Sequence, residues 1–193
     1  MTTTTALQKY GTQLLFADHS GDFGATPTTP ANSLILGTPT DVQIDTGGVT
    51  AAAMRQSTKT GSLAFDAGVN NSMPMEWVLG ACIENATAPD AGGTWDFYWS
   101  GSPSATAGTG NSGKTTGADA AYTADGLSQM VFIGSLVVAN TVVNMDAQIG
   151  TFSMPYLYGS LVVVNNTSTA MATVVDETHI VITPVISDVQ AAV

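Results

Sequence analysis

The chain has 193 residues, which is enough for one domain with a sizeable core that needs no disulfide or metal to fold. Hydrophobic residues make up 44% and charged residues only 10%, so the chain is not of the disordered class and its polarity rests on Thr, Ser, Asn and Gly. The net charge is -11 and the four basic residues form no cluster, which excludes binding to a nucleic acid and disfavours an anionic membrane surface.

Cys82 is the only cysteine and lies in an apolar run, so no intrachain disulfide can form and we expect a buried thiol.

The sequence also indicates where the protein is made. The start, MTTTTALQKYG, has neither the basic beginning nor the long apolar stretch of a signal peptide. No apolar run approaches the roughly 20 residues that span a bilayer. We therefore expect synthesis in the cytoplasm, no export through a signal peptide and no membrane partner.

The first fifty residues are rich in Gly, Pro, Thr and Asp, which favour turns and oppose helix. Two short strands are plausible, around 34–36 and 42–44. With few large apolar residues, the segment is expected to contribute little to a core and to order on binding a neighbour. We therefore predict an irregular N-terminal arm over 1–50 and a β-sandwich domain over 51–193.

Strand-length units follow from Ala51. In SLAFDAG, Leu63 and Phe65 share one face, whereas the apolar run EWVLGACIEN fits a helix or a buried strand. In TWDFYWS, large aromatic residues alternate with Asp96 and Tyr98, which is the period of a strand with one buried face. The turn ATAPDAGG between these two runs leads us to interpret them as a long hairpin.

Residues 101–117 form a long loop of Gly, Ser, Thr and Ala. Four β runs follow at short spacing: LSQMVFIGSLVVAN, VVNMDAQIGTFSM, YGSLVVVNNTS and THIVITPVI. Many strands at regular spacing without helices between them predict an all-β sandwich or barrel. The leading architecture is a jelly-roll-like β-sandwich of eight strands in two sheets.

One motif matches a nucleotide-binding pattern. Residues Gly108 to Thr115 read GTGNSGKT, which fits the P-loop pattern with Lys114 as the phosphate-binding lysine. A P-loop requires a strand directly before it and a helix directly after it, whose N-terminus faces the anion. SPSATA precedes the motif and TGADAAYTADG follows it, and neither segment fits. We therefore interpret the match as a Gly-rich loop, and an NTPase remains the third functional hypothesis.

Other chemical signals are weak. The stretch Asp18 to Asp22 is similar to the start of a calcium loop, but the later positions that need Gly and Glu hold Phe23 and Thr29. His19 and His179 are the only histidines, and His179 is placed at a strand start. Cys82 and a distant histidine are not enough to propose a thiol nucleophile. Nothing in the sequence singles out one pair of acidic residues as the two carboxylates of a glycoside hydrolase. We therefore predict no enzymatic activity, no catalytic or metal-binding residues and no cofactor.

The three tryptophans are the remaining candidates for a binding site. Trp77, Trp95 and Trp99 could form a platform on which a sugar stacks, or they could belong to the core or a subunit interface. The alternation in TWDFYWS favours the core.

Several segments together resemble a family of small structural proteins of tailed bacteriophages. They are EWVLGACIENATAPDAGGTWDFYWSGSPSATAGTGN, ADAAYTADGLSQMVFIGSLVV (which includes Asp119–Tyr122), GTFSMPYLYGSLVVVNNTS and ETHIVITPV, within residues 51–186. The resemblance is one of strand and turn segments and carries no catalytic motif. It implies a β-sandwich virion component without enzymatic activity, a group that includes head decoration (cement) proteins and fibre proteins.

The leading functional hypothesis is therefore a capsid decoration protein on the outer head surface. It would bind the major capsid protein as a homo-oligomer, a trimer or dimer, and stabilise the head through many modest contacts. The alternative is a tail or fibre module that binds a host surface glycan, with Trp95 and Trp99 as its candidate residues.

Overall fold

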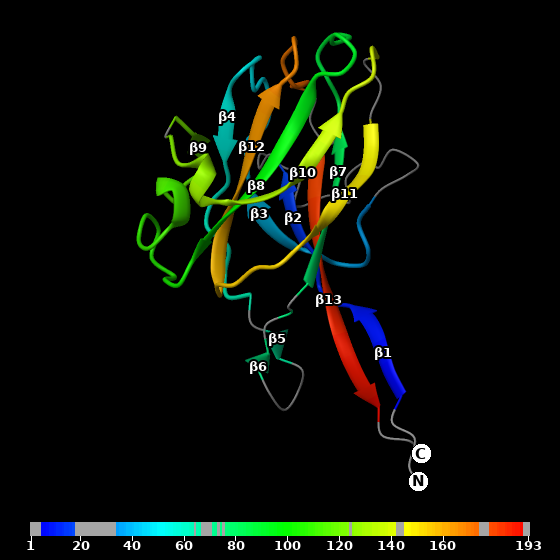
Figure 1. The fold of residues 1–193 in the computed structure, drawn as a ribbon, viewed down its shortest axis with the longest axis vertical. Coiled ribbons are helices and arrows are strands. Elements are labelled where there is room, and N and C mark those ends of the chain that lie inside the picture. Colours follow the sequence, from blue (N-terminus) through cyan, green and yellow to red (C-terminus); the bar gives the residue numbers. More distant parts are fainter. Residues whose placement is uncertain are drawn as a thin grey trace.

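The protein is an all-β sandwich, which confirms the predicted fold class (Figure 1). The computed structural model describes residues 5–17, 34–63, 65–66, 71–72, 74, 76–123, 125–141, 145–173 and 178–190. Within these residues the helical segments are two short 3-10 turns, η1 (Ser112–Lys114) and η2 (Leu127–Gln129).

Two sheets make up the sandwich. Sheet A contains β1 (Thr5–Tyr10), β2 (Leu14–Ala17), β3 (Thr40–Gln43), β7 (Glu76–Ile83), β11 (Met145–Phe152) and β13 (His179–Gln190). Sheet B contains β4 (Met54–Gln56), β8 (Thr94–Ser102), β9 (Ala120–Ala121), β10 (Val131–Val137) and β12 (Tyr158–Asn166). A small separate hairpin joins β5 (Phe65–Asp66) and β6 (Asn71–Ser72).

The strand order is that of a jelly roll. Sheet A runs β11-β7-β13-β2-β3 and sheet B runs β10-β8-β12-β4-β9. Eight strands carry this pattern and can be numbered one to eight along the chain: β2, β4, β7, β8, β10, β11, β12 and β13. In that numbering, the order across sheet A is 6-3-8-1 and the order across sheet B is 5-4-7-2. All these pairs are antiparallel, whereas β3 adds in parallel beside β2. Long connections between the sheets replace simple hairpins, as two interlocked Greek keys require.

The N-terminal segment differs from the predicted arm. Within 1–50, β2 and β3 are strands of sheet A, and Phe16, Val42 and Ile44 lie in the main core. The physical reason is that the strand period turns Leu14 and Phe16 of β2 and Val42 of β3 into the main core, although turn-forming residues surround these strands. The predicted strand at 42–44 overlaps β3, whereas 34–36 is not a strand.

The predicted hairpin of EWVLGACIEN and TWDFYWS is wrong. Both runs are strands, but β7 belongs to sheet A and β8 to sheet B, so the connection between them crosses the sandwich. Each strand carries large apolar residues on its inward face, and burial of both faces against each other favours opposite sheets over side-by-side pairing. Similarly, SLAFDAG is not one strand: Leu63 is buried outside any strand, and β5 begins at Phe65.

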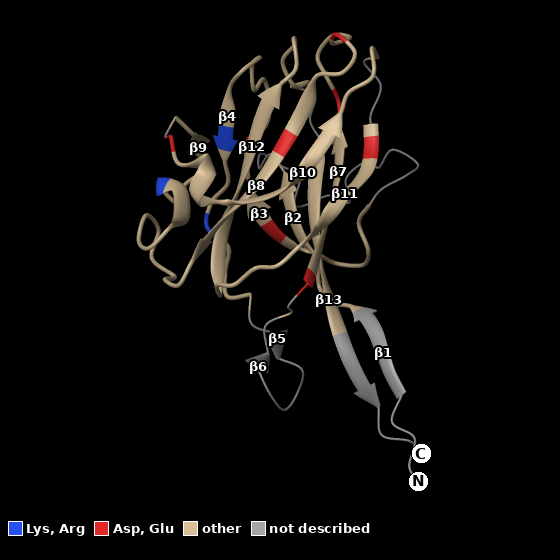
Figure 2. Cartoon of the chain, viewed as in Figure 1, with Lys and Arg blue, Asp and Glu red and all other residues tan. Residues whose placement is uncertain are grey.

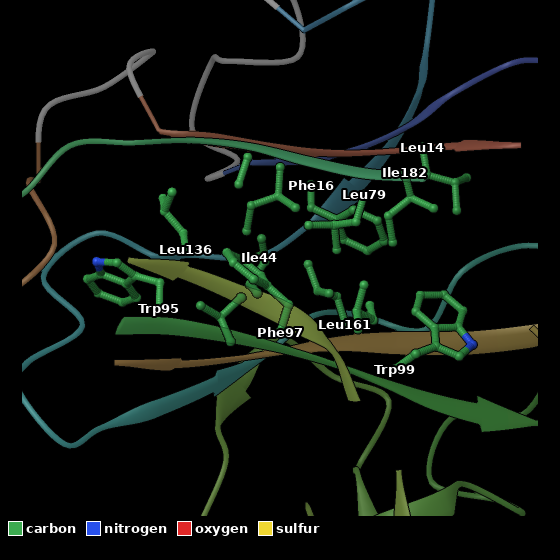
Figure 3. Packing of buried hydrophobic residues seen from close by; sticks show 14 of the residues in the cluster. Leu14, Phe16, Ile44, Leu79, Trp95, Phe97, Trp99, Leu136, Leu161 and Ile182 are labelled. Carbon is green, nitrogen blue, oxygen red and sulfur yellow. The ribbon is translucent and has the colours of Figure 1, made fainter. Parts of the chain in front are cut away.

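The core lies between the two sheets (Figure 3). From sheet B, Trp95, Phe97 and Trp99 of β8 lie in the same core cluster as Phe16 of β2 and Leu79 of β7. The strand alternation predicted for TWDFYWS is therefore confirmed. Rings of Phe16 and Trp99 meet edge to face with centroids 6.5 Å apart, which links the sheets directly.

Tight packing around Trp99 explains one glycine. A Cβ atom on Gly159 of β12 would lie only 2.3 Å from the Trp99 indole, so no side chain fits at this position. Glycine therefore lets the Trp99 indole pack directly against the backbone of the neighbouring strand.

A two-stranded ribbon extends from the sandwich (Figure 1). The second half of β13 runs beyond sheet A and pairs with β1, from Tyr10 opposite Val185 to Thr5 opposite Gln190. Beyond Val185, β13 pairs with no described strand other than β1, and β1 likewise pairs only with β13. Both outer edges of the ribbon backbone are therefore open within the described chain.

Candidate functional site

The tryptophans do not form a surface platform. Trp95 and Trp99 have no exposed area and Trp77 is 1% exposed, so all three belong to the core. The Trp95 indole donates a hydrogen bond to Asn85 Oδ1 at 3.2 Å, and that of Trp77 donates to the Pro74 carbonyl at 3.1 Å. The preference for a core role over a sugar-binding role is confirmed.

The Gly108–Thr115 segment does not have P-loop geometry. Strand β8 ends at Ser102, and the only helical turn of the motif is the three-residue η1, in which Gly113 and Lys114 have φ of 63° and 61°. Lys114 points outward to the exposed Asp125 carboxylate, at 3.0 Å, and Thr115 is buried against the Ser100 hydroxyl. The backbone amides therefore do not line a helix N-terminus, as phosphate binding in a P-loop requires.

The second motif glycine serves packing. A Cβ atom on Gly113 would lie 2.7 Å from the Gly126 carbonyl and 2.5 Å from the Met130 side chain. The Tyr122 hydroxyl donates to the Gly113 carbonyl at 2.6 Å and accepts from the Gly126 amide at 3.0 Å. The match to the nucleotide-binding pattern thus arises from residues that fix this loop to Tyr122, Gly126 and Met130.

Lys59 holds the first part of the same loop. Its ammonium donates to the Ser102 hydroxyl and to the carbonyls of Ser104, Thr106 and Thr109, at 2.7–3.1 Å. Partial burial lowers the pKa of the Lys59 ammonium from its ordinary value. This lysine is a structural clamp, and its hydrogen-bonding capacity is used within the chain.

The charged side chains either pair with other residues of the chain or lie scattered over the fold (Figure 2). Arg55 of β4 pairs with Asp119 at 2.7 Å and with Asp45 at 3.6 Å, which ties together segments far apart in sequence. Three of the four basic residues, Arg55, Lys59 and Lys114, therefore have partners within the chain. No basic surface suited to a phosphate backbone is formed in the described part of the chain.

A row of side chains that carry a thiol, an imidazole and a carboxyl group crosses the outer face of sheet A. By register, Cys82 of β7 lies opposite His179 of β13 on one side and opposite Asp146 of β11 on the other. Thiol, imidazole and carboxyl groups are the components of a cysteine nucleophile. However, Cys82 has no exposed area and His179 is 2% exposed, so in this structure the row is closed to a substrate. The sequence separation of these residues hides the row, which appears only through strand pairing.

Among the described side chains, no three of His, Cys, Asp and Glu are grouped closely enough to hold a metal ion. The calcium-like stretch Asp18–Asp22, with His19, lies outside the described residues. None of the described helical segments has the length and apolar character needed to cross a bilayer.

The outer face of sheet B carries the exposed Phe132 beside the partly buried Tyr98. Strand pairing places Phe132, Tyr98 and Val162 in one row, and Ser135, Asp96 and Val164 in the next, across β10, β8 and β12. On the β12 side, Val162 and Val164 are buried beneath a cluster that includes Tyr122, Leu127 and Met130. On the β10 side, Phe132 is 53% exposed, whereas Tyr98, between the two sides, is partly buried and packs against that cluster. The open part of the face is therefore the β10 side.

We call this part of the sheet the β8–β10 face, made of Asp96, Tyr98, Phe132, Ser135 and, at its end, Asn166. The Tyr98 and Phe132 rings lie 5.2 Å apart at their centroids and are tilted by 54°. Asn166 donates to Asp96 Oδ2 at 2.7 Å. Burial, and secondly the Asp96 charge, raises the pKa of Tyr98. The alternation in TWDFYWS could have shown that Tyr98 points away from the tryptophans, but not that Phe132 lies beside it.

Comparisons with models of known protein families, with curated protein sequences and with solved structures found no match for this chain.

Proposed function

We propose that this protein is a structural component of a tailed-bacteriophage virion that decorates the outer surface of the head. The resemblance of residues 51–186 to phage structural proteins supports this proposal. The jelly-roll sandwich supplies a rigid body, and the acidic balance of -11 suits a position away from packaged DNA.

The observation that carries the proposal is the ribbon of β1 and the second half of β13. An isolated two-stranded ribbon is marginally stable in water, because it has no sheet face to bury. Its open backbone edges can accept a further strand from a neighbouring protein, so that main-chain hydrogen bonds provide affinity. In this proposal the partner is the major capsid protein. Copies of the decoration protein that are related by symmetry each make such a contact, and the contacts together stabilise the head.

The test uses heads purified from phage that lack this protein. We expect the full chain to co-sediment with these heads to a stoichiometry that follows the capsid lattice. Deletion of residues 1–10, which removes β1, should greatly weaken binding and leave the thermal melt nearly unchanged, since β1 pairs only with the outer half of β13 among the described strands.

A matched control is Leu36→Ala, which changes an exposed apolar residue outside the ribbon. Equal binding by the deletion variant and the full chain would show that the ribbon is not the anchor. Failure of the full chain to bind the heads, or a copy number of only a few per virion, would contradict head decoration and favour a fibre or neck component.

A further inference from the structure

We propose that the β8–β10 face binds a saccharide ring, with Tyr98 and Phe132 as the stacking residues. Side chains of both residues lie on the outer face of sheet B, opposite each other on paired strands. Phe132 is 53% exposed although it is a large apolar residue. A sugar ring has a C–H face that packs on an aromatic ring and a rim of hydroxyl groups that needs polar partners.

The polar partners stand next to the aromatic pair. Ser135 and Asp96 form the adjacent row of the face, and Asn166 donates to Asp96 Oδ2. Asp96 Oδ1 accepts no hydrogen bond within the described chain and is shielded from solvent. A carboxylate oxygen without a donor is energetically costly. In the complex that we propose, a hydroxyl group of the sugar would supply that donor.

The size and composition of the face favour a sugar over a protein partner. The aromatic surface is the ring pair of Tyr98 and Phe132, with Ser135 and Asp96 in the next row and the exposed Val137 of β10 in the row beyond. The neighbouring valines on β12 are already covered. A stable protein interface needs a much larger contiguous area, on the order of 800 Å² per partner. One or a few sugar rings match the extent of the aromatic pair.

Charge narrows the class of sugar. Asp96 lies at the centre of the face, none of its five residues is basic, and the chain carries -11 overall. A sialic or uronic acid would place its carboxylate near Asp96 and be repelled. The ligand class is therefore a neutral or amino sugar. This inference does not depend on the ribbon or on head decoration, so either proposal can fail alone.

The experiment measures binding of the purified full chain to immobilised oligosaccharides. The probes are neutral hexose, hexosamine and N-acetylhexosamine oligosaccharides, with sialylated and uronate-containing ones as the acidic comparison. We expect binding to at least one neutral or amino-sugar probe and none to the acidic probes. Phe132→Ala and Phe132→Leu should weaken that binding about tenfold or more, which corresponds to roughly 1.4 kcal/mol.

Two further variants separate stacking from other effects. Phe132→Trp keeps an aromatic ring and should retain binding, whereas Leu36→Ala, on a residue outside this face, should leave it unchanged. All variants should melt near the temperature of the parent chain, since Phe132 is half exposed. Binding that survives Phe132→Ala, equal binding by Phe132→Leu, selective binding of acidic probes, or no binding to any probe would each overturn the proposal.

Discussion

At the scale of single residues, burial assigns different roles to similar neighbours. Asn165 and Asn166 are adjacent in sequence, but Asn165 has no exposed area and Asn166 is exposed. Asn165 Nδ2 donates to the carbonyls of Val49 and Thr169, and its Oδ1 accepts from the amide and hydroxyl of Thr167. Asn165 therefore joins the end of β12 to two separate turns.

The Asn165→Ala variant should lose stability, by about 3 kcal/mol, because the substitution leaves the Thr167 amide without its acceptor and removes one of the two donors to each of the Val49 and Thr169 carbonyls. The matched variant Asn166→Ala removes one exposed hydrogen bond, to Asp96, and should cost less than about 1 kcal/mol. Chemical denaturation of the two variants and the parent chain measures the difference. Equal losses would show that the buried network does not anchor the turns.

Tyr98 should make stability depend on alkaline pH. Its pKa in the folded protein is raised by burial and then by Asp96. The folded chain therefore holds this proton to a higher pH than the unfolded chain, so the contribution is complete below about pH 10 and is lost as pH rises through the folded pKa. The melting temperature of the parent should fall more steeply above about pH 10 than that of Tyr98→Phe. Parallel curves for the two proteins would contradict this assignment.

At the scale of elements, the sandwich depends on strands contributed by distant parts of the chain. Strand β2 pairs with β13, and β3 pairs with β2, so the first fifty residues supply one side of sheet A. Gln13 reinforces this contact, since its side-chain amide donates to Thr183 Oγ1 at 2.7 Å and to the Leu34 carbonyl at 3.0 Å. The N-terminal segment is therefore part of the folded unit in its described residues.

Residues 51–193 alone should not form a cooperatively folded domain. This truncation removes Phe16, Val42 and Ile44 from the core, and loss of one such aromatic side chain typically costs about 3–5 kcal/mol. Residues 11–193, which lack only β1 among the described strands, should melt cooperatively. Near-ultraviolet circular dichroism and thermal melts of the two truncations test this. A cooperative melt of 51–193 would restore the interpretation of 1–50 as an arm.

At the scale of the whole molecule, the two sheets leave different surfaces for partners. Residues 34–35 pack on the outer side of sheet A, against Leu15, Ala17 and Val181. Tyr122, Leu127 and Met130 cover the β12 side of sheet B and reach Tyr98, whereas Phe132 on the β10 side of the β8–β10 face stays exposed. The ribbon extends from the sandwich with open backbone edges (Figure 1). We therefore propose two separate binding surfaces: the open backbone edges of the ribbon, and the aromatic side chains of the β8–β10 face.

The sequence by itself determined the fold class and the long strands β7, β8 and β10 to β13, because alternation of apolar residues and turn-forming residues are local signals. It also placed the tryptophans in the core. It did not show the short strands β4, β6 and β9. Tertiary structure alone decided that β7 and β8 lie in opposite sheets and that β2 belongs to the sandwich. It also brought Tyr98 beside Phe132, and Cys82 beside His179. These relations depend on strand pairing between distant segments, which a single sequence does not encode in any local pattern.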